Sequence, residues 1–207
     1  MIEGVVLAQN KNLSSNTNSI WKPNPKKDYL VQIQTDFGEI VLYLYDQTPI
    51  HKANFLNLSL NGFYDGTTFH RVLEGFVIQG GDPNSKVGAD STKIGYGSAG
   101  DDLLPEFVES LKHERGAVAA ARKDDAINPE KRSSASQFYI VQAKEGAHHL
   151  DGSYTVFGKV IKGMEVVDKI ASQEVGKYGK PNKPIRMIVK LMLLKKKDIK
   201  KRYGEIF

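Results

Sequence analysis

The segment from residue 69 to residue 83 holds the side chains whose types and spacing best fit chemistry. Arg71 and Gln79, which carry planar hydrogen-bonding heads, lie among apolar neighbours, namely Phe69, Val72, Leu73, Phe76, Val77 and Ile78. Apolar residues at this density predict a segment that is at least half buried, where a guanidinium without a partner is costly. Glu74 lies in a predicted turn and is expected to be solvated. Arg71 therefore either pairs with a distant carboxylate, such as that of Glu106, or acts on a ligand.

Composition and motifs exclude several kinds of site. With 207 residues, 40% of them hydrophobic and 26% charged, the chain fits one globular domain with tails. The sequence has no cysteine, which excludes disulfides, thiolate nucleophiles and cysteine-ligated metals. His148 and His149 are adjacent and lack a third ligand at regular spacing, and no hydrolase elbow or phosphate loop occurs. The sequence thus implies no metal and no cofactor.

Two long segments, 84–113 and 123–136, show no periodicity and are predicted to be surface loops that shape a site. The first contains a stretch, Gly95 to Gly100, that matches a dinucleotide-binding fingerprint letter by letter. No apolar strand precedes this stretch and no periodic helix follows it. It is therefore interpreted as a flexible loop.

The basic charge of the chain is concentrated at its C-terminal end. Residues 195 to 202 hold six basic residues and one acid, a balance of +5 that equals the net charge of the whole chain. These residues contain no aromatic side chain on which a base could stack, so no specific nucleic-acid binding is expected. Residues 195–207 are predicted to form a solvated basic tail, with contact to phosphates as the alternative.

Residues 1–28 read as a polar leader that buries too little apolar surface to fold alone. Its Trp21 is expected to dock on the body of the protein. The apolar run from Val5 to Ala8 is too short to span a membrane or to serve as an export signal. The chain as written is expected to be cytoplasmic, and periplasmic if a longer signal once preceded this run.

Hydrophobic periodicity predicts a mainly β domain over residues 29–194. A helix should begin at Thr48 and Pro49 and end near Asn61, and a second should span 164–171. Strands are predicted near 29–34, 40–45, 68–73, 76–79, 117–121, 137–142, 154–161 and 185–193. Eight short strands with only two helices indicate an all-β barrel or sandwich decorated by helices, and the strands covered on both faces favour a barrel.

Several motifs occur in the order found in one family. They are Phe69-His70-Arg71, Gly75-Phe76, Gln79 to Asp82, Ser136 to Ile140, Leu150 to Gly152, and Val156 to Val160. From Tyr29 to Leu194 the chain resembles cyclophilins. This resemblance implies a closed eight-stranded antiparallel barrel capped by two helices, which catalyses cis/trans isomerisation of X–Pro peptide bonds. It also implies proline-containing peptides and unfolded proteins as partners and a monomeric state. No membrane contact is expected, because the apolar run from Val5 to Ala8 is too short to span a membrane.

The resemblance assigns a role to each matching residue. Arg71 becomes the catalytic residue, with Gln79 and Gln137 beside it. The proline pocket would be lined by Phe76, Val77, Tyr139 and Leu150, the substrate backbone would lie along Ala121 and Arg122, and the rim would comprise His149 and Tyr154.

Five of these positions differ from the best-known eukaryotic pattern: Val77, Arg122, Tyr139, His149 and Tyr154. Arg122 and Tyr154 resemble bacterial members of the family. His149 stands where a tryptophan associated with cyclosporin binding is usual, so weak cyclosporin binding is predicted.

The residue types fit this reaction without a nucleophile. Rotation about an X–Pro bond must overcome a barrier of about 18–20 kcal/mol but makes and breaks no covalent bond. A cation that donates to the prolyl nitrogen acts mainly on the twisted transition state. His70 is interpreted as structural, because the rotation needs no general base. Two alternatives stay open: the pocket residues could be ordinary core, with the two glutamines satisfying buried backbone, and the domain could bind proline peptides without turning them over.

Overall fold

The computed structural model describes residues 22–204. Most of the predicted leader, including the docking of Trp21, lies outside the described residues. Within the described part of the chain, no helix is long and apolar enough to cross a membrane.

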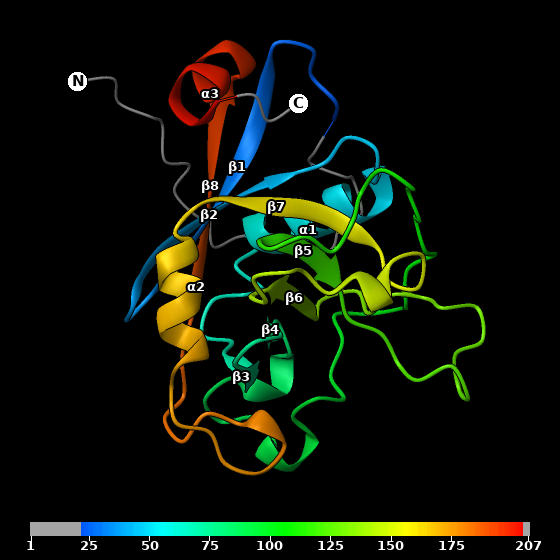
Figure 1. Ribbon diagram of the computed structural model, residues 1–207, viewed down its shortest axis with the longest axis vertical. Helices are drawn as coiled ribbons and strands as arrows, with labels where there is room; N and C mark the ends of the chain where they lie inside the picture. The colour runs from blue at the N-terminus through cyan, green and yellow to red at the C-terminus, as the bar shows by residue number, and fades with distance from the viewer. Residues whose placement is uncertain (1–21, 205–207) are drawn as a thin grey trace.

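Eight antiparallel strands form one strongly curled sheet (Figure 1). Along the sheet they run in the order β3, β4, β6, β5, β7, β2, β1, β8. The strands are β1 (Lys27–Thr35), β2 (Gly38–Leu44), β3 (Phe69–Leu73), β4 (Val77–Gly80), β5 (Ala117–Ala120), β6 (Phe138–Val141), β7 (Val156–Lys162) and β8 (Ile188–Lys195). The eight strands predicted from periodicity are therefore confirmed, with small shifts at their ends.

The sheet is an open, curled half-barrel, so the prediction of a closed barrel is corrected. Its edge strands β3 and β8 do not pair with each other along their length. The segments that lead into them are joined by an isolated bridge between Thr68 and Arg186. Around this bridge the Phe69 N–H donates to the Ile185 carbonyl and the Met187 N–H donates to the Thr67 carbonyl. Strand β8 begins at Ile188, three residues later than predicted, where its pairing with Gln34 of β1 begins.

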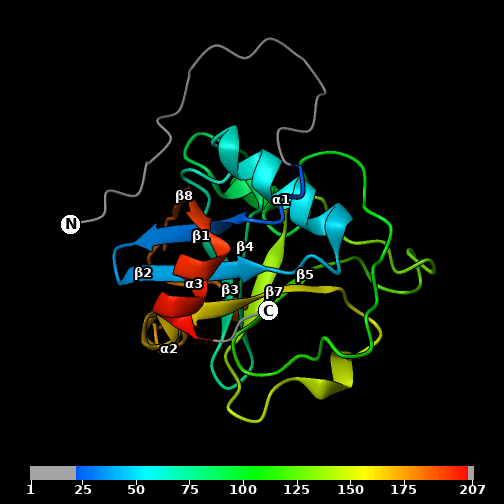
Figure 2. The ribbon, with the colours of Figure 1, turned by 90° about the horizontal axis from the view of Figure 1, so that it is seen from above.

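Two helices complete the core. Helix α1 (Pro49–Leu60) follows Thr48 with proline in its first turn and ends at Asn61, as predicted. Helix α2 (Met164–Ala171) begins after Gly163, which has a φ of 95°. Both helices bury apolar side chains in the same cluster as the inner face of the sheet, among them Phe55, Leu56, Val166, Val167 and Ile170. Figure 2 shows α1 and α2 lying across different parts of the sheet.

A third helix, α3 (Lys196–Tyr203), forms within the segment predicted as a solvated basic tail, and most of its basic side chains are exposed. Ile199 is fully buried against Leu30, Val41 and Tyr43 on the outer side of β1 and β2. Most residues of this segment are charged. Its one anchoring apolar side chain, Ile199, gives no hydrophobic periodicity from which a helix could be predicted. The lysines of α3 are mostly exposed, and the helix lies at the opposite end of Figure 1 from β3, β4 and β6.

We expect Ile199→Ala to lower the free energy of unfolding by about 2 kcal/mol, the low end for a buried isoleucine, because a terminal helix can relax into the cavity. Urea denaturation measures the change. Lys197→Ala, on the exposed face of the same helix, should stay within about 0.5 kcal/mol of the parent chain. Equal effects of the two substitutions would mean that Ile199 does not anchor α3.

Candidate functional site

The predicted site lies on the outer face of strands β3, β4, β6 and β5. Arg71 pairs with Gln79, Gln79 with Tyr139, and Tyr139 with Ala119, so these residues form one row across the sheet. Cross-strand partners point to the same face, and residues two apart along a strand share that face. Val77, Ala121 and Gln137 therefore join the row, while Val72, Ile78, Ile140 and Val118 point into the core.

A bulge in β3 sets Arg71 on this face. Between the Phe69–Gly80 and Arg71–Gln79 pairs, β3 has one more residue than β4, which is His70. His70 is buried, and burial lowers the pKa of its imidazole despite the nearby Asp82 carboxylate. His70 is thus neutral at pH 7 and adds no second positive charge beside Arg71, which agrees with its interpretation as a structural residue.

Arg71 is held by neutral amides. Its Nη1 donates to Gln79 Oε1 at 3.2 Å, and Gln79 Nε2 donates to Gln137 Oε1 at 3.0 Å. Gln137 Nε2 in turn donates to Asp82 Oδ2 at 3.2 Å. Among the described residues, Arg71 forms no ion pair. The proposed partner Glu106 instead accepts from the backbone of Ile50 and His51 and from the His51 ring.

Asp82, which the sequence did not assign to the site, anchors the loop from Gly95 to Gly100, called here the glycine-rich loop. Its carboxylate is fully buried and accepts from the backbone N–H groups of Asn84, Gly95 and Gly97, at 2.7, 2.6 and 3.1 Å. Gln137 Nε2 also donates to the carbonyls of Gly95 and Gly97. The loop expected to be flexible is therefore tied to the same amide network that holds Arg71.

A cavity of about 180 Å³ opens beside Arg71. Nine of the eleven predicted site residues line it: Arg71, Phe76, Val77, Gln79, Ala121, Arg122, Tyr139, Leu150 and Tyr154. The other two lie next to this lining. His149 stacks on Phe76 with ring centroids 5.5 Å apart, and Gln137 stands behind Gln79.

Arg122 contributes to the site in two ways. Its guanidinium lies over the Tyr154 ring, 4.4 Å from the centroid, and its Nε donates to the Ser153 carbonyl at 2.8 Å. Both backbone groups of Ala121 are engaged, with the carbonyl of Gln137 and the N–H of Ser134. Among the described residues, the backbone of Arg122 forms no backbone hydrogen bond. Of the two residues predicted to lie along a substrate, Arg122 is thus the one with backbone groups to offer.

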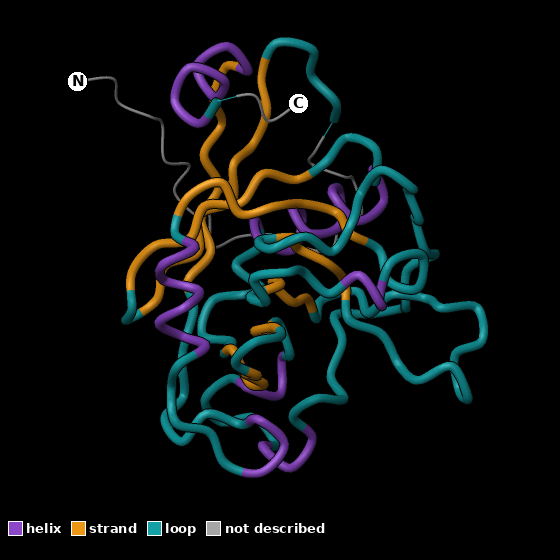
Figure 3. Tube along the Cα trace, in the orientation of Figure 1, coloured by secondary structure: helices purple, strands orange, loops and turns teal. Residues whose placement is uncertain are grey.

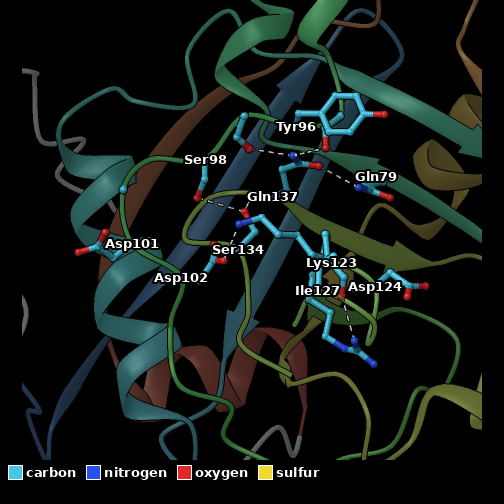
Figure 4. Close-up of a pocket in the computed structure, with 15 residues that line it drawn as sticks. Gln79, Tyr96, Ser98, Asp101, Asp102, Lys123, Asp124, Ile127, Ser134 and Gln137 are labelled. Carbon is cyan, nitrogen blue, oxygen red and sulfur yellow. Dashed lines mark hydrogen bonds and ion pairs between the residues drawn. The ribbon is translucent and has the colours of Figure 1, made fainter. Parts of the chain in front are cut away.

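A second cavity of about 540 Å³ adjoins the first across Gln79, Ala121 and Arg122 (Figure 4). The glycine-rich loop forms one of its walls, and Asp101, Asp102, Lys123 and Asp124 add charge around it. Lys123 Nζ and Asp102 Oδ2 are 2.9 Å apart, and Figure 4 shows this pair away from Gln79 and Gln137. Except for Gln79 in β4, the residues that line this cavity lie outside the helices and strands, in segments that Figure 3 draws as loop. Its existence could not be read from the sequence beyond the expectation that long loops shape a site.

Comparisons with known proteins are consistent with this geometry. Residues 30–191 match the family described as cyclophilin type peptidyl-prolyl cis-trans isomerase. The peptidyl-prolyl cis-trans isomerase CYP18-1 of Arabidopsis thaliana is 40% identical over 159 residues, which is 76% of this chain and 91% of that protein. A peptidyl-prolyl cis-trans isomerase of Acinetobacter baylyi is 39% identical over 169 residues, 77% of this chain and 82% of that protein. Since plant and bacterial relatives are similarly close, the bacterial character suggested by Arg122 and Tyr154 stays a prediction.

Solved structures agree. A cyclophilin type peptidyl-prolyl cis-trans isomerase of Cryptosporidium parvum superposes with a TM-score of 0.68 at 32% identity, covering 80% of this chain and 96% of that one. A second structure of that protein, in the presence of the dipeptide Ala-Pro, superposes with a TM-score of 0.67 at 31% identity, covering 80% of this chain and 98% of that one.

Proposed function

We propose, from the premise that this chain belongs to the cyclophilin family of peptidyl-prolyl cis-trans isomerases, that Arg71 catalyses the rotation by hydrogen bonding to the prolyl nitrogen. The observation that carries this proposal is a guanidinium at the wall of a cavity that apolar side chains also line, with no ion-pair partner among residues 22–204. A carboxylate partner would cancel its charge. The neutral oxygen of Gln79 orients the group and leaves the charge available to a ligand.

The twisted amide explains why this arrangement favours the transition state. In the planar amide the nitrogen lone pair is delocalised into the carbonyl, so the nitrogen is a poor acceptor. As the bond rotates the lone pair localises, and a donor fixed beside it gains a hydrogen bond that the ground state lacks. The chain of amides through Gln79 and Gln137 to buried Asp82 supports this role, because it holds the donor in place before the substrate arrives.

The apolar side chains of the smaller cavity would hold the proline ring. Phe76, Val77, Tyr139 and Leu150 present apolar surface there, and excluding water strengthens the hydrogen bond from Arg71. The backbone of Arg122 would pair with the backbone of the peptide. A longer peptide would continue past Gln79 into the larger cavity. Proline-containing segments of unfolded proteins are the proposed substrates, acted on by a monomer that assists folding, since slow prolyl isomerisation limits many folding reactions.

The test is NMR exchange spectroscopy on an Ala-Pro peptide with catalytic amounts of the protein. We expect faster exchange between the cis and trans signals. Binding without faster exchange would refute the catalytic proposal and support the alternative of a non-catalytic proline-binding module.

Weak cyclosporin binding remains a prediction, and His149 is its reason. Its ring stacks on Phe76, and it stands where the family resemblance would place a tryptophan. We expect isothermal titration calorimetry to detect no tight complex with the parent chain, and a gain in affinity for His149→Trp. A tight complex with the unaltered protein would contradict this expectation.

A further inference from the structure

A histidine buried behind the smaller cavity links one of its walls to a carboxylate. His113 is fully buried, and its Nδ1 lies 2.8 Å from Asp151 Oδ1, which also accepts from the His113 backbone N–H at 2.8 Å. Its Nε2 lies 3.0 Å from the hydroxyl of Tyr139. The two rings stack with centroids 6.0 Å apart and an angle of 16° between their planes. Neither His113 nor Asp151 lines the smaller cavity, so the link acts from outside it.

The direction of these hydrogen bonds follows from the charge of Asp151. Burial would raise the pKa of its carboxyl, but the hydrogen bonds from His113 and His148 outweigh burial and hold this pKa at about 2. At neutral pH the carboxylate can only accept, so Nδ1 of His113 carries the proton. In a neutral imidazole Nε2 is then an acceptor, and the Tyr139 hydroxyl must be the donor.

This hydrogen bond holds a side chain that lines the smaller cavity. Tyr139 is 4% exposed, and among the described residues its hydroxyl bonds only to His113. Its ring also packs edge-on against Tyr154, which lines the same cavity. A buried hydroxyl without an acceptor is costly, so the acceptor on His113 determines where the ring rests.

We propose that His113 is a positioning residue, whose neutral imidazole holds the Tyr139 hydroxyl and so makes proline binding weaken as the pH falls. This role rests on the proposed assignment of the cavity beside Arg71 as the proline site. It accounts for a tyrosine at position 139, where a phenylalanine would offer the same apolar ring without the hydroxyl.

Protonation of His113 would reverse the arrangement. Nε2 would become a donor, and the hydroxyl hydrogen of Tyr139 would have to turn toward the apolar residues that pack around it, such as Val77 and Ala119. The ionisable groups that face His113 are Asp151, His148, His149, Tyr139 and Tyr154. Burial, aided by the two neighbouring histidines and opposed by Asp151, lowers the pKa of His113 below its usual value. The neutral form therefore persists to a pH below the ordinary histidine range and is lost as the pH falls further. Arginine stays charged throughout, so the chemical step should change less than binding.

The test compares KM and kcat for an Ala-Pro peptide between pH 7.5 and 5, measured by NMR exchange. For the parent chain we expect KM to rise by about threefold or more toward the acid end, because the buried hydroxyl hydrogen of Tyr139 then has no acceptor and the ring shifts, with a smaller change in kcat. Tyr139→Phe lacks the hydroxyl that His113 holds, so its KM should not change with pH, whether that KM is higher or lower than the parental value. His148→Ala removes one of the two histidines that help to lower the pKa of His113, so the rise of KM should begin at a slightly higher pH than in the parent chain. The same rise of KM in Tyr139→Phe as in the parent chain would overturn the proposal.

A second measurement keeps the inference testable apart from turnover. Long-range ¹H–¹⁵N spectra of the folded parent chain at pH 7.5 should show His113 protonated at Nδ1 only. Protonation at Nε2 would overturn the hydrogen-bond arrangement even if the enzyme is active. Failure of the parent chain to accelerate exchange at any pH would instead overturn the proposed function, and with it the role of His113 in binding.

Discussion

Replacing Arg71 with alanine is expected to lower kcat/KM for an Ala-Pro peptide by about one to two orders of magnitude or more. A hydrogen bond to a charged group contributes about 1.5–3 kcal/mol, and each tenfold in rate corresponds to about 1.4 kcal/mol. The loss in rate is larger than this contribution of one hydrogen bond if water enters the vacated space and weakens the remaining electrostatic interactions. Stability should change little, because Arg71 is only half buried and donates to a neutral oxygen. Protease-coupled or NMR assays measure the rate, and urea denaturation measures the stability.

Two further substitutions show which property of Arg71 matters. Arg71→Lys keeps the charge but loses the planar fork of donors, so it should recover only part of the activity. Arg186→Ala removes the same charge from an exposed position and should leave activity unchanged. Parental activity in Arg71→Ala would contradict the catalytic assignment, whereas equal losses in both alanine variants would point to overall charge as the cause.

Replacing Lys52 with methionine is expected to lower the free energy of unfolding by about 3–5 kcal/mol, the usual cost of leaving a buried charge without its partner. Lys52 in α1 is fully buried, and its Nζ lies 2.8 Å from Asp28 Oδ2 and 2.6 Å from Asp46 Oδ1. Asp28 at the start of β1 is itself 4% exposed. Methionine fills a similar volume, so the change isolates the charge. The midpoint of urea unfolding measures the effect.

The buried partner of Lys52, Asp28, supplies the control for this prediction. Asp28→Asn combined with Lys52→Met removes both buried charges and keeps an oxygen that can accept from the Tyr29 N–H, so it should be more stable than Lys52→Met alone. Lys190→Met, on an exposed part of β8, should stay within about 0.5 kcal/mol of the parent chain. A stability of Lys52→Met within about 1 kcal/mol of the parent would show that the pair does not hold α1 to β1.

Local sequence patterns predicted most of the elements that position the site. Alternation identified the strands, and Thr48 with Pro49 placed the start of α1. The sequence left two interpretations of Arg71 open, and the contacts of the described residues favour action on a ligand over pairing with Glu106. The order of the motifs also predicted a shared site for residues from β3, β4, β6 and the later loops, and most of these residues line one cavity.

What the sequence could not predict depends on contacts between distant segments. Whether β3 and β8 pair along their length depends on how two segments far apart in the sequence meet, which hydrophobic periodicity does not report. The burial of Ile199 depends on a hollow formed by strands more than 150 residues earlier. Asp82 bonds to a loop 13 to 15 residues away, and His113 bonds to Tyr139 across 26 residues. No periodic or compositional signal reports such polar pairs.

The most direct test of the central claim compares binding and catalysis in one experiment, by titrating an Ala-Pro peptide into the parent chain and into Arg71→Ala under NMR observation. Chemical-shift changes at residues such as Tyr139 report binding, and exchange between the cis and trans signals reports catalysis. We predict that Arg71→Ala still binds the peptide at the same cavity but loses at least about nine-tenths of the exchange rate, as expected if the hydrogen bond forms mainly in the transition state. Unchanged exchange in Arg71→Ala, or chemical-shift changes confined to another face of the protein, would contradict the account.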